Sequence, residues 1–386
     1  MKTKKPQAIC FVLTSPFVLN AFLLNHLQAL ADHYAVTVCI NTQESVVSPL
    51  LDDRVELIHL PIAREIDLRQ DLIALVWLIR FFRHRKFDAV HSVTPKGGLL
   101  GMLAAKLTGV PHRIHTFTGQ VWATRRGFSK WLLKSSDRLL ALCSSMLLAD
   151  SVSQAEFLNH QGICRKGSTK VLGGGSISGV DLQKFSHSPG RREAMRLGLA
   201  VPSDALVFVF VGRLHREKGV LVLARAFTEL KKHSKHAWLW FVGPDEEGLG
   251  VELLKISGER SLVLGLTQKP EEYLDAADVL CLPSYREGFG TVVIEAAAMG
   301  VPAIGSDIYG LSDAIVNSKT GLLVPAGDEI GLLEAMQKMS SFDLRSALGR
   351  CAQQRAYDAF DAQKITASWL RFYATVFSSV SQEVPS

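Results

Sequence analysis

Short apolar runs alternate with longer amphipathic stretches along most of this 386-residue chain. Continuous apolar runs of four to eight residues are typical of buried parallel strands, and the stretches between them are typical of helices. In the first half, strands are predicted at 7–14 and 35–41, with a loop and a helix at 16–32. Two later strands are predicted to end near Val93 and at Phe117. This alternation predicts a doubly wound α/β domain.

The second half of the chain shows the same alternation. A strong buried-strand signal covers 205–212, and further strands are predicted at 238–243, 261–267 and 279–282. The chain is also too long for one ordinary core, so two domains are expected. We assign the first domain to 1–185 and the second to 205–360.

The segment between these domains is polar. Residues 186–204 include Pro189 and Pro202, and this composition predicts a linker or hinge.

The richest candidate chemistry lies around residue 290, where a predicted strand is followed by a glycine-bearing loop and the helix TVVIEAAAM. Free backbone N–H groups at Gly290, Thr291 and Val292, with the positive end of the helix dipole, make a site for a phosphate. Glu287 and Glu295 flank these amides, and each carboxylate can accept hydrogen bonds from vicinal hydroxyls. The order fits a ligand with a central diphosphate. The alternative is one buried, salt-bridged Glu and one solvated Glu.

Two cations follow the strong strand signal of the second half. Arg213 and Lys218 lie in RLHREKG, ahead of another predicted helix. Arginine offers a fork of donors to phosphate oxygens and lysine a movable point charge, so the pair can neutralise a diphosphate. Ordinary exposed charge is the alternative.

Polar residues also follow or end strands of the first domain. Open α/β sheets bind ligands beyond the carboxyl ends of their strands. Ser15 follows the first strand, His91 and His115 lie near the ends of two later strands, and Thr118 stands in the next turn. A lone strand histidine is more often structural, but two on neighbouring strands favour a site.

Two segments of the first domain mix basic with apolar side chains. RFFRHRK at 80–86 follows an apolar run of about a dozen residues, short of the roughly 20 that cross a bilayer. VWATRRGFSKW at 121–131 carries Arg125 and Arg126 among aromatic residues. These segments suit anionic lipid or an acceptor diphosphate. Solvated charge is the open alternative.

Composition excludes several other classes of protein. A net charge of +6 is mild for this length and does not by itself imply nucleic acid binding. The six cysteines lie far apart without a C-x-x-C pair, which argues against a disulfide framework or a zinc site. The apolar N-terminal run resembles a signal peptide, but polar residues interrupt it and it contains the first predicted strand. A cytoplasmic protein is expected.

The spacing Glu287-x7-Glu295, inside SYREGFGTVVIEAAAMGVPAIG, closely resembles the signature of the retaining GT-B glycosyltransferases of family 4. GRLHREKG and GLLVPAGD add to this resemblance, which covers nearly the whole chain. The resemblance implies two Rossmann-like domains facing across a cleft, with the final helix in 361–386 crossing back to the first domain.

The resemblance also implies roles for single residues. Glu287 would orient the donor sugar and Glu295 would bind the ribose. The family often has a catalytic His where Thr118 stands, so either His115 would supply that catalytic role here or the enzyme does without it. The implied donor-binding residues are Arg213, Lys218, Gly288, Phe289, Gly290, Thr291, Val292, Glu295 and Leu266. Ser15, His91, Thr118, Arg125 and Arg126 are candidate acceptor or sugar contacts.

The activity implied is retaining transfer of a hexosyl or N-acetylhexosaminyl group from a nucleotide sugar, expected to be UDP-linked. The acceptor implied is a lipid-linked saccharide at the inner face of the cytoplasmic membrane, as in lipopolysaccharide or O-antigen synthesis. No Asp-x-Asp occurs in the chain, so neither a metal nor a cofactor is expected. A GT-B nucleotide-sugar epimerase and a non-catalytic nucleotide-sugar binder are the alternatives.

Overall fold

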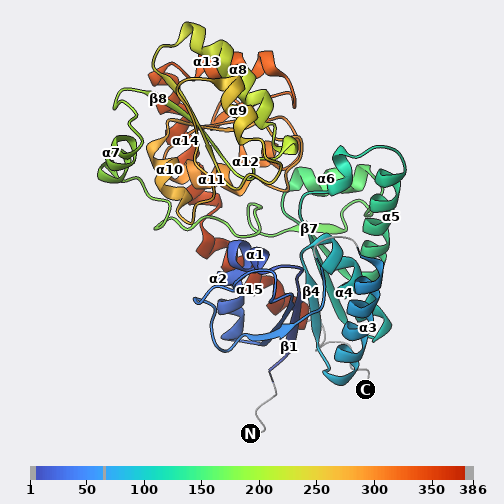
Figure 1. Cartoon of the computed structure of the whole chain (residues 1–386). Helices are drawn as coiled ribbons and strands as arrows, with labels where there is room; N and C mark the ends of the chain where they lie inside the picture. Colours follow the sequence, from blue (N-terminus) through green and yellow to red (C-terminus); the bar gives the residue numbers. More distant parts are fainter. Residues whose placement is uncertain (1–5, 64–66, 379–386) are drawn as a thin grey trace. The chain divides into compact units, whose positions relative to one another are not determined.

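The computed structural model describes residues 6–63 and 67–378, which form two compact units (Figure 1). One unit runs to Ser178 and resumes at Gln363, and the other is Gly179–Ala362. Each unit is a parallel sheet with helices on both faces, which confirms the predicted pair of doubly wound α/β domains.

The sheet of the first unit has seven parallel strands in the order β3-β2-β1-β4-β5-β6-β7. The strands are β1 (Ala8–Val12), β2 (Ala35–Ile40), β3 (Glu56–His59), β4 (Ala89–Ser92), β5 (His112–Phe117), β6 (Met146–Ala149) and β7 (Thr169–Val171). The helices are α1 (Pro16–Val18), a π-helical turn (Leu19–Leu23), α2 (Leu24–Ala31), α3 (Leu68–His84), α4 (Pro95–Leu107), a 3-10 turn (Val121–Thr124), α5 (Gly127–Cys143), α6 (Val152–His160) and α15 (Ala362–Ser378). The first strand therefore begins and ends within the predicted 7–14.

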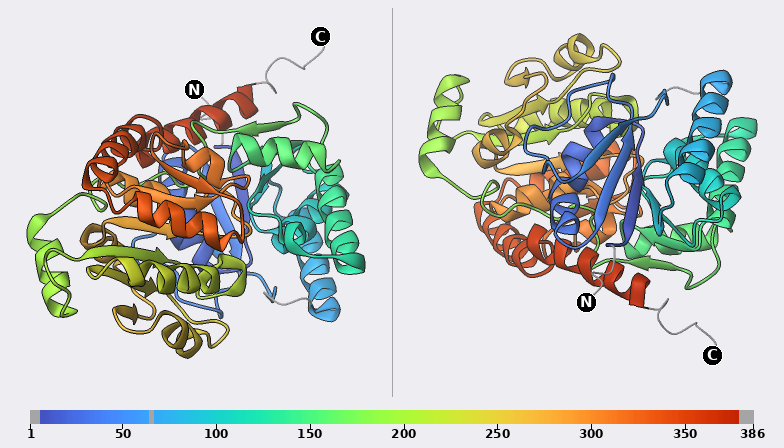
Figure 2. Two further views of the ribbon diagram at one scale, coloured as in Figure 1. Left: turned by 90° about the horizontal axis from the view of Figure 1, so that it is seen from above. Right: turned by 90° about the horizontal axis from the view of Figure 1, so that it is seen from below.

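Helices cover both faces of this first sheet. Alternate residues of β1 enter different cores, because successive side chains of a strand point to opposite faces. Phe11 packs with α2 and α15, whereas Val12 packs with α3, α4 and α5. Figures 1 and 2 show α3, α4 and α5 side by side along one face.

The C-terminal helix α15 is part of the first unit's core. Trp369 and Tyr373 are buried and pack with β1 and α2. The Tyr373 hydroxyl lies 2.8 Å from Nδ1 of His91 on β4. The chain therefore returns to the first unit through an aromatic contact, as the resemblance implied for the final helix.

The sheet of the second unit has six parallel strands in the order β10-β9-β8-β11-β12-β13. The strands are β8 (Leu206–Val211), β9 (Ala237–Val242), β10 (Ser261–Val263), β11 (Val279–Leu282), β12 (Ala303–Ser306) and β13 (Gly321–Val324). The helices are α7 (Pro189–Gly198), a 3-10 turn (Arg216–Lys218), α8 (Val220–His233), α9 (Gly250–Ser257), α10 (Pro270–Ala276), α11 (Thr291–Ala298), α12 (Leu311–Ala314), α13 (Glu329–Lys338) and α14 (Phe342–Ala359). Strand order reverses between β8 and β11, which is where open α/β sheets bind ligands.

Residues 186–204, which the composition predicts as a linker, fold onto the second unit and contain α7. Arg192 and Arg196 of α7 pair with Asp278 at 2.6 and 2.8 Å. Arg191 pairs with buried Asp275 at 2.8 Å. These ion pairs fix the segment, and the chain passes between the units at 178–179 and 362–363 instead.

Candidate active site

The loop between β11 and α11 forms the predicted strand, glycine loop and helix. Gly290 precedes α11 with a φ of 84°, a left-handed conformation that glycine adopts without strain. A Cβ on Gly290 would also lie 2.5 Å from Leu311 of α12. Gly290 is the N-cap residue of α11 and has no side chain that could cap the first turn. The amides at Thr291 and Val292 therefore remain available to an anion.

Lys218 and Glu287 form an ion pair at this site. Lys218 Nζ lies 2.5 Å from Oε1 of Glu287, and the Ser284 hydroxyl donates to the same oxygen at 2.9 Å. The two charged side chains are 18% and 13% exposed. They meet because β8 and β11 are neighbours and both charged residues follow the strand ends.

Gly219 makes this close approach possible. Its φ is 71°, and a Cβ there would lie 2.0 Å from the carbonyl oxygen of Pro283, at the end of β11. Any side chain at this position would push the Lys218 turn away from the β11 loop. The glycine after Lys218 is therefore required by packing as well as by backbone conformation.

Arg213 is held by a residue that the sequence interpretation did not include. Its Nη1 donates to Glu246 Oε2 at 2.5 Å. Glu246 lies in the loop after β9, the strand next to β8. The signal was present in the sequence as two consecutive glutamates, Glu246 and Glu247, directly after a predicted strand. A diphosphate that binds Arg213 competes with this carboxylate.

Glu295 lies one turn into α11, on the same helix as Thr291. It is partly exposed, yet the surrounding protein raises its pKa to about 7. Burial is the main cause, Lys184 opposes the shift, and Glu271 adds to it. A carboxyl group that titrates near neutral pH suits hydrogen bonding to neutral hydroxyls.

The remaining donor-side residues differ in how they are placed. Leu266 is 70% exposed in the loop after β10. Phe289 is 2% exposed and packs edge-on against Phe360, with ring centroids 5.2 Å apart. The Phe289 side chain therefore anchors the loop in the core, so a donor contact there can come only from its backbone. Gly288 lies between Glu287 and this anchor.

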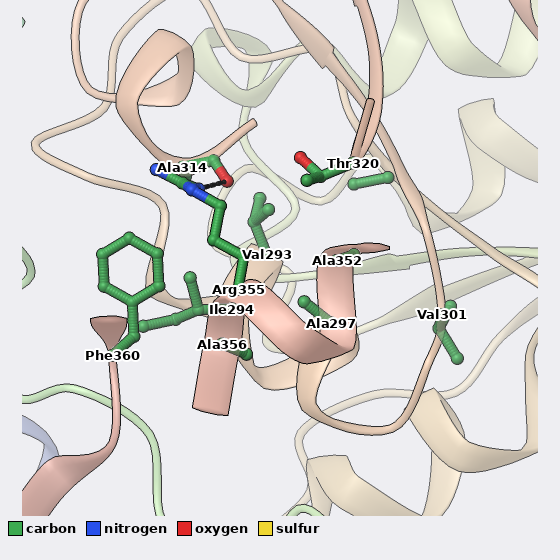
Figure 3. Close-up of a pocket in the computed structure, with 11 residues that line it drawn as sticks. Val293, Ile294, Ala297, Val301, Ala314, Thr320, Ala352, Arg355, Ala356 and Phe360 are labelled. Carbon is green, nitrogen blue, oxygen red and sulfur yellow. Dashed lines mark hydrogen bonds between the residues drawn. The ribbon is translucent and has the colours of Figure 1, made fainter. Parts of the chain in front are cut away.

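A small pocket lies on the other side of α11, between α11 and α14 (Figure 3). Arg355 of α14 reaches across it and donates to the carbonyls of Asp313 at 2.5 Å and Ala314 at 2.7 Å. These carbonyls end α12, whose first residue, Leu311, packs on Gly290. The pocket includes none of the predicted donor residues, and Arg355 supports the donor loop through α12.

His115 does not lie where the predicted catalytic role requires. It is 1% exposed inside β5, and its Nδ1 bonds Ser92 Oγ at 2.8 Å. A Cβ added at Gly98 of α4 would lie 2.6 Å from the ring. Burial lowers the pKa of His115 to about 3, so the ring is neutral. The structure gives His115 a packing role under α4 and does not support catalysis by this residue.

His91 is buried on the opposite face of the same sheet. Its Nε2 pairs with Thr116 Oγ1 at 2.8 Å, and its ring stacks on Trp369 at 5.1 Å. Burial holds the pKa of His91 well below the usual value. His91 is therefore a core residue and not a sugar contact.

The other first-unit candidates stand at or beyond strand ends. Ser15 is the residue before α1, and Thr118 is partly exposed after β5, where its carbonyl accepts from Gln120 and Gln154 at 2.6 and 2.5 Å. Arg125 and Arg126 are exposed just before α5. These residues remain candidates for the acceptor.

Asp150 is a first-unit residue that the sequence interpretation missed. It follows β6 and is 7% exposed, and burial raises its pKa to about 7. Its Oδ1 has no hydrogen-bond partner among the described residues. Among residues 6–63 and 67–378, no group of three or more His, Cys, Asp or Glu is arranged to hold a metal ion.

Two Rossmann-like parallel sheets and a glycine loop with flanking acids and cations define a GT-B glycosyltransferase. The family model described as "Glycosyl transferases group 1" matches residues 205–341, and the one described as "Glycosyl transferase 4-like domain" matches residues 19–175. The chain belongs to this family of glycosyltransferases, which confirms the resemblance.

Relatives in sequence are named as glycosyltransferases, and solved structures share the fold. The chain is 29% identical over 326 residues to the capsular polysaccharide biosynthesis glycosyltransferase CapM of Staphylococcus aureus, covering 83% of this chain and 85% of CapM. It is 27% identical over 325 residues to the UDP-Gal:alpha-D-GlcNAc-diphosphoundecaprenol alpha-1,3-galactosyltransferase of Escherichia coli, covering 81% and 82%. The Anabaena protein Alr3699/HepE in complex with UDP-glucose matches with a TM-score of 0.77 at 18% identity, covering 95% and 99%.

Proposed function

We propose that this glycosyltransferase moves a hexosyl or N-acetylhexosaminyl group from a UDP-sugar to a lipid-linked saccharide, with retention of the anomeric configuration. It acts at the inner face of the cytoplasmic membrane, as a peripheral protein in surface polysaccharide synthesis. The observation that carries the proposal is that Arg213 and Lys218 follow β8 and that α11 follows the neighbouring strand β11. Glu287 stands before the start of α11, where it pairs with Lys218, and Glu295 stands one turn into the helix.

These residues suit the charges that develop during sugar transfer. Breaking the bond between the anomeric carbon and the diphosphate oxygen leaves negative charge on the diphosphate and positive charge on the sugar. Arg213, Lys218 and the first amides of α11 stabilise the leaving diphosphate without a metal ion. Glu287 orients the sugar hydroxyls and balances the positive charge, and Glu295 accepts from the ribose.

The pairing of Lys218 with Glu287 links donor binding to the acid. Lys218 lies within reach of Glu287, so a diphosphate that draws Lys218 toward itself leaves the carboxylate to the sugar. The exchange replaces one anionic partner of the lysine by another, and this limits the cost of breaking the pair.

Relatives support the choice of donor and acceptor. HepE was solved with UDP-glucose, and the E. coli relative is named for UDP-galactose and a diphosphoundecaprenol-linked sugar. CapM is named for capsular polysaccharide. We therefore propose a UDP-sugar and a diphosphate-linked lipid acceptor for this chain.

The test is UDP release from a panel of UDP-sugars, with and without a bacterial lipid extract or a GlcNAc-diphosphate-lipid acceptor. One UDP-sugar should release UDP only when acceptor is present. Epimerisation of a labelled UDP-sugar without acceptor would replace transfer by isomerisation.

The matched variant for this test is Glu287→Ala. It should lower turnover by about 10²–10³-fold, since it removes a charge that acts in the transition state, and should leave UDP affinity nearly intact. Glu229→Ala serves as control, because Glu229 is an exposed acid of α8 that pairs with Lys232. Unchanged turnover in Glu287→Ala would favour a non-catalytic binder.

A further inference from the structure

The outer face of α5 is apolar, although it faces solvent. Phe128, Trp131, Leu132, Leu139 and Leu142 are between 44% and 74% exposed. Their spacing places them along one stripe of the helix, opposite the buried residue Asp137. A surface helix normally presents charged and polar side chains there. The aromatic pair Phe128 and Trp131 stacks at 5.6 Å and forms the N-terminal end of this stripe.

The neighbouring helices also carry exposed apolar side chains. Leu68, Leu72 and Ile73 of α3 are 81%, 61% and 59% exposed, and Leu107 of α4 is 57% exposed. Helix α4 contacts both α3 and α5, and the three lie side by side over one face of the sheet (Figures 1 and 2). We call the exposed apolar residues of these three helices the α3–α5 surface. Exposed apolar side chains gathered on neighbouring helices are typical of an interaction site.

The charge on α3, on α5 and beside them is mainly positive, although Asp67 caps α3 and Arg85 pairs with Glu56 of β3 at 2.6 Å. Segments 68–86 and 125–143 together hold ten Arg and Lys residues and two Asp. The net charge of these two segments is therefore more positive than the net charge of +6 of the whole chain. Both acids are neutralised or covered: Asp71 pairs with Lys96 at 2.5 Å, and Asp137 is buried and accepts from Trp122 at 2.7 Å. The surface therefore combines exposed apolar side chains with positive charge.

We propose that the α3–α5 surface docks on a bilayer that contains anionic lipids. Leucine, phenylalanine and tryptophan side chains enter the boundary between headgroups and acyl chains, while Arg and Lys contact lipid phosphates. Every helix of the described residues is too short or too polar to span a bilayer. A protein partner would need a matching acidic and apolar patch, whereas an anionic bilayer supplies both everywhere.

The docking also orients the first unit. Helices in a doubly wound unit run antiparallel to the strands, so the N-terminal halves of α3 and α5 lie near the carboxyl ends of the strands. These halves carry Leu68, Leu72, Phe128 and Trp131. The same edge bears Thr118, a candidate acceptor contact. Docking thus brings the carboxyl edge of the first sheet close to the lipid headgroups. That this orientation serves catalysis rests on the proposed lipid-linked acceptor.

Sedimentation with vesicles of phosphatidylcholine and about 30% phosphatidylglycerol, which gives the bilayer a negative surface potential, tests the proposal. The full chain should bind these vesicles, bind pure phosphatidylcholine much more weakly, and be partly released by salt. Phe128→Ser with Trp131→Ser should weaken binding roughly tenfold or more. Arg80→Glu with Arg83→Glu should weaken it by a similar factor.

Matched controls come from the second unit. Phe342 and Leu197 are 72% and 82% exposed, so Phe342→Ser with Leu197→Ser removes as much exposed apolar surface elsewhere. Lys255→Glu with Lys338→Glu reverses two exposed charges at other helix ends. Both control pairs should bind vesicles like the unmodified chain.

Three results would overturn the proposal. The unmodified chain could fail to bind anionic vesicles, or the controls could lose as much binding as the test variants. The third result concerns a dimer in solution. If Phe128→Ser with Trp131→Ser converts such a dimer to monomer and vesicle binding persists, the α3–α5 surface binds a second copy of the chain. Calorimetry with UDP on the same samples separates the two proposals, because absent UDP binding with intact vesicle binding refutes only the proposed function.

Discussion

The two sheets place their polar residues differently along the strands. In the second unit, Arg213, Lys218 and Glu287 all follow strand ends, and each keeps part of its side chain exposed. In the first unit, His91 and His115 lie within β4 and β5 and are at most 1% exposed. A side chain only one or two positions before the strand end is thus inaccessible, whereas a side chain after the strand end reaches the site.

The reason is that helices cover both faces of each sheet. Alternate strand side chains point to opposite faces. His91 meets α15 on one face and His115 meets α4 on the other. His91 is hydrogen-bonded through both ring nitrogens and His115 through Nδ1, and burial lowers the pKa of both rings, so both stay neutral. Four predictions test this contrast between the two units.

The largest expected effect is on stability, in His115→Ala. Loss of the packed ring and of its bond to Ser92 should lower the free energy of unfolding by about 2–4 kcal/mol. Transfer per folded molecule should change little. Chemical denaturation gives the free energy of unfolding, and the rate of sugar transfer by the same sample gives the turnover. If the variant is as stable as the unmodified protein but its turnover falls a hundredfold, His115 is a catalytic residue and the difference between the two units does not hold.

Lys218→Ala should weaken UDP binding by about ten- to a hundredfold, which corresponds to a charge-assisted hydrogen bond of about 1.5–3 kcal/mol. Calorimetric titration with UDP gives the affinity. Lys232→Ala, on the exposed face of α8, is the matched control and should bind UDP normally. Normal UDP affinity in Lys218→Ala would move the diphosphate away from the β8 turn.

Donor binding should depend on pH through Glu295. Its pKa is raised to about 7, so the carboxyl takes up a proton as the pH falls from 8 to 6 and accepts fewer hydrogen bonds. UDP affinity should fall about three- to tenfold over this range. Glu295→Gln should remove that part of the dependence, which separates it from titration of UDP itself. An equal slope in both proteins would exclude Glu295 from the ribose site.

The same shift has a consequence for stability with the opposite pH sign. The folded state holds a proton that the unfolded chain releases, so stability falls as the pH rises from about 4.5 through 7. Glu295→Gln should therefore raise Tm at pH 8 relative to the unmodified chain more than it does at pH 4.5.

The smallest expected effect is a gain, in Glu246→Gln. Arg213 pairs with Glu246, so removing the acid's charge should raise UDP affinity by about two- to fivefold. Glu252→Gln, which loses a pair with the neighbouring Arg216, is the control. A loss of UDP affinity would mean that Glu246 positions Arg213 and does not compete with the diphosphate.

Much of the second unit could be predicted from the sequence. The strand at 279–282 ends where the apolar run ends, and α11 begins at Thr291, because the glycine loop interrupts the pattern just before it. Arg213 and Lys218 were identified for the same reason: both stand directly after a long apolar strand. Local chain properties fix these positions.

Contacts between distant segments could not be predicted in this way. Nothing near Phe289 in the sequence shows that its ring packs on Phe360, and nothing near residues 186–204 shows that α7 is bound by Asp275 and Asp278. The partner of Arg213 lies 33 residues away. The same holds for Asp150, whose raised pKa depends on burial by other segments.

The sequence by itself determined most of the succession of strands and helices, the family and the donor loop, because periodicity, glycines and charge spacing act over a few residues. Tertiary structure alone decided which polar side chains are accessible. Burial depends on helices that return from elsewhere in the chain, and so His115 and His91 became core residues while α5 kept an apolar face toward solvent.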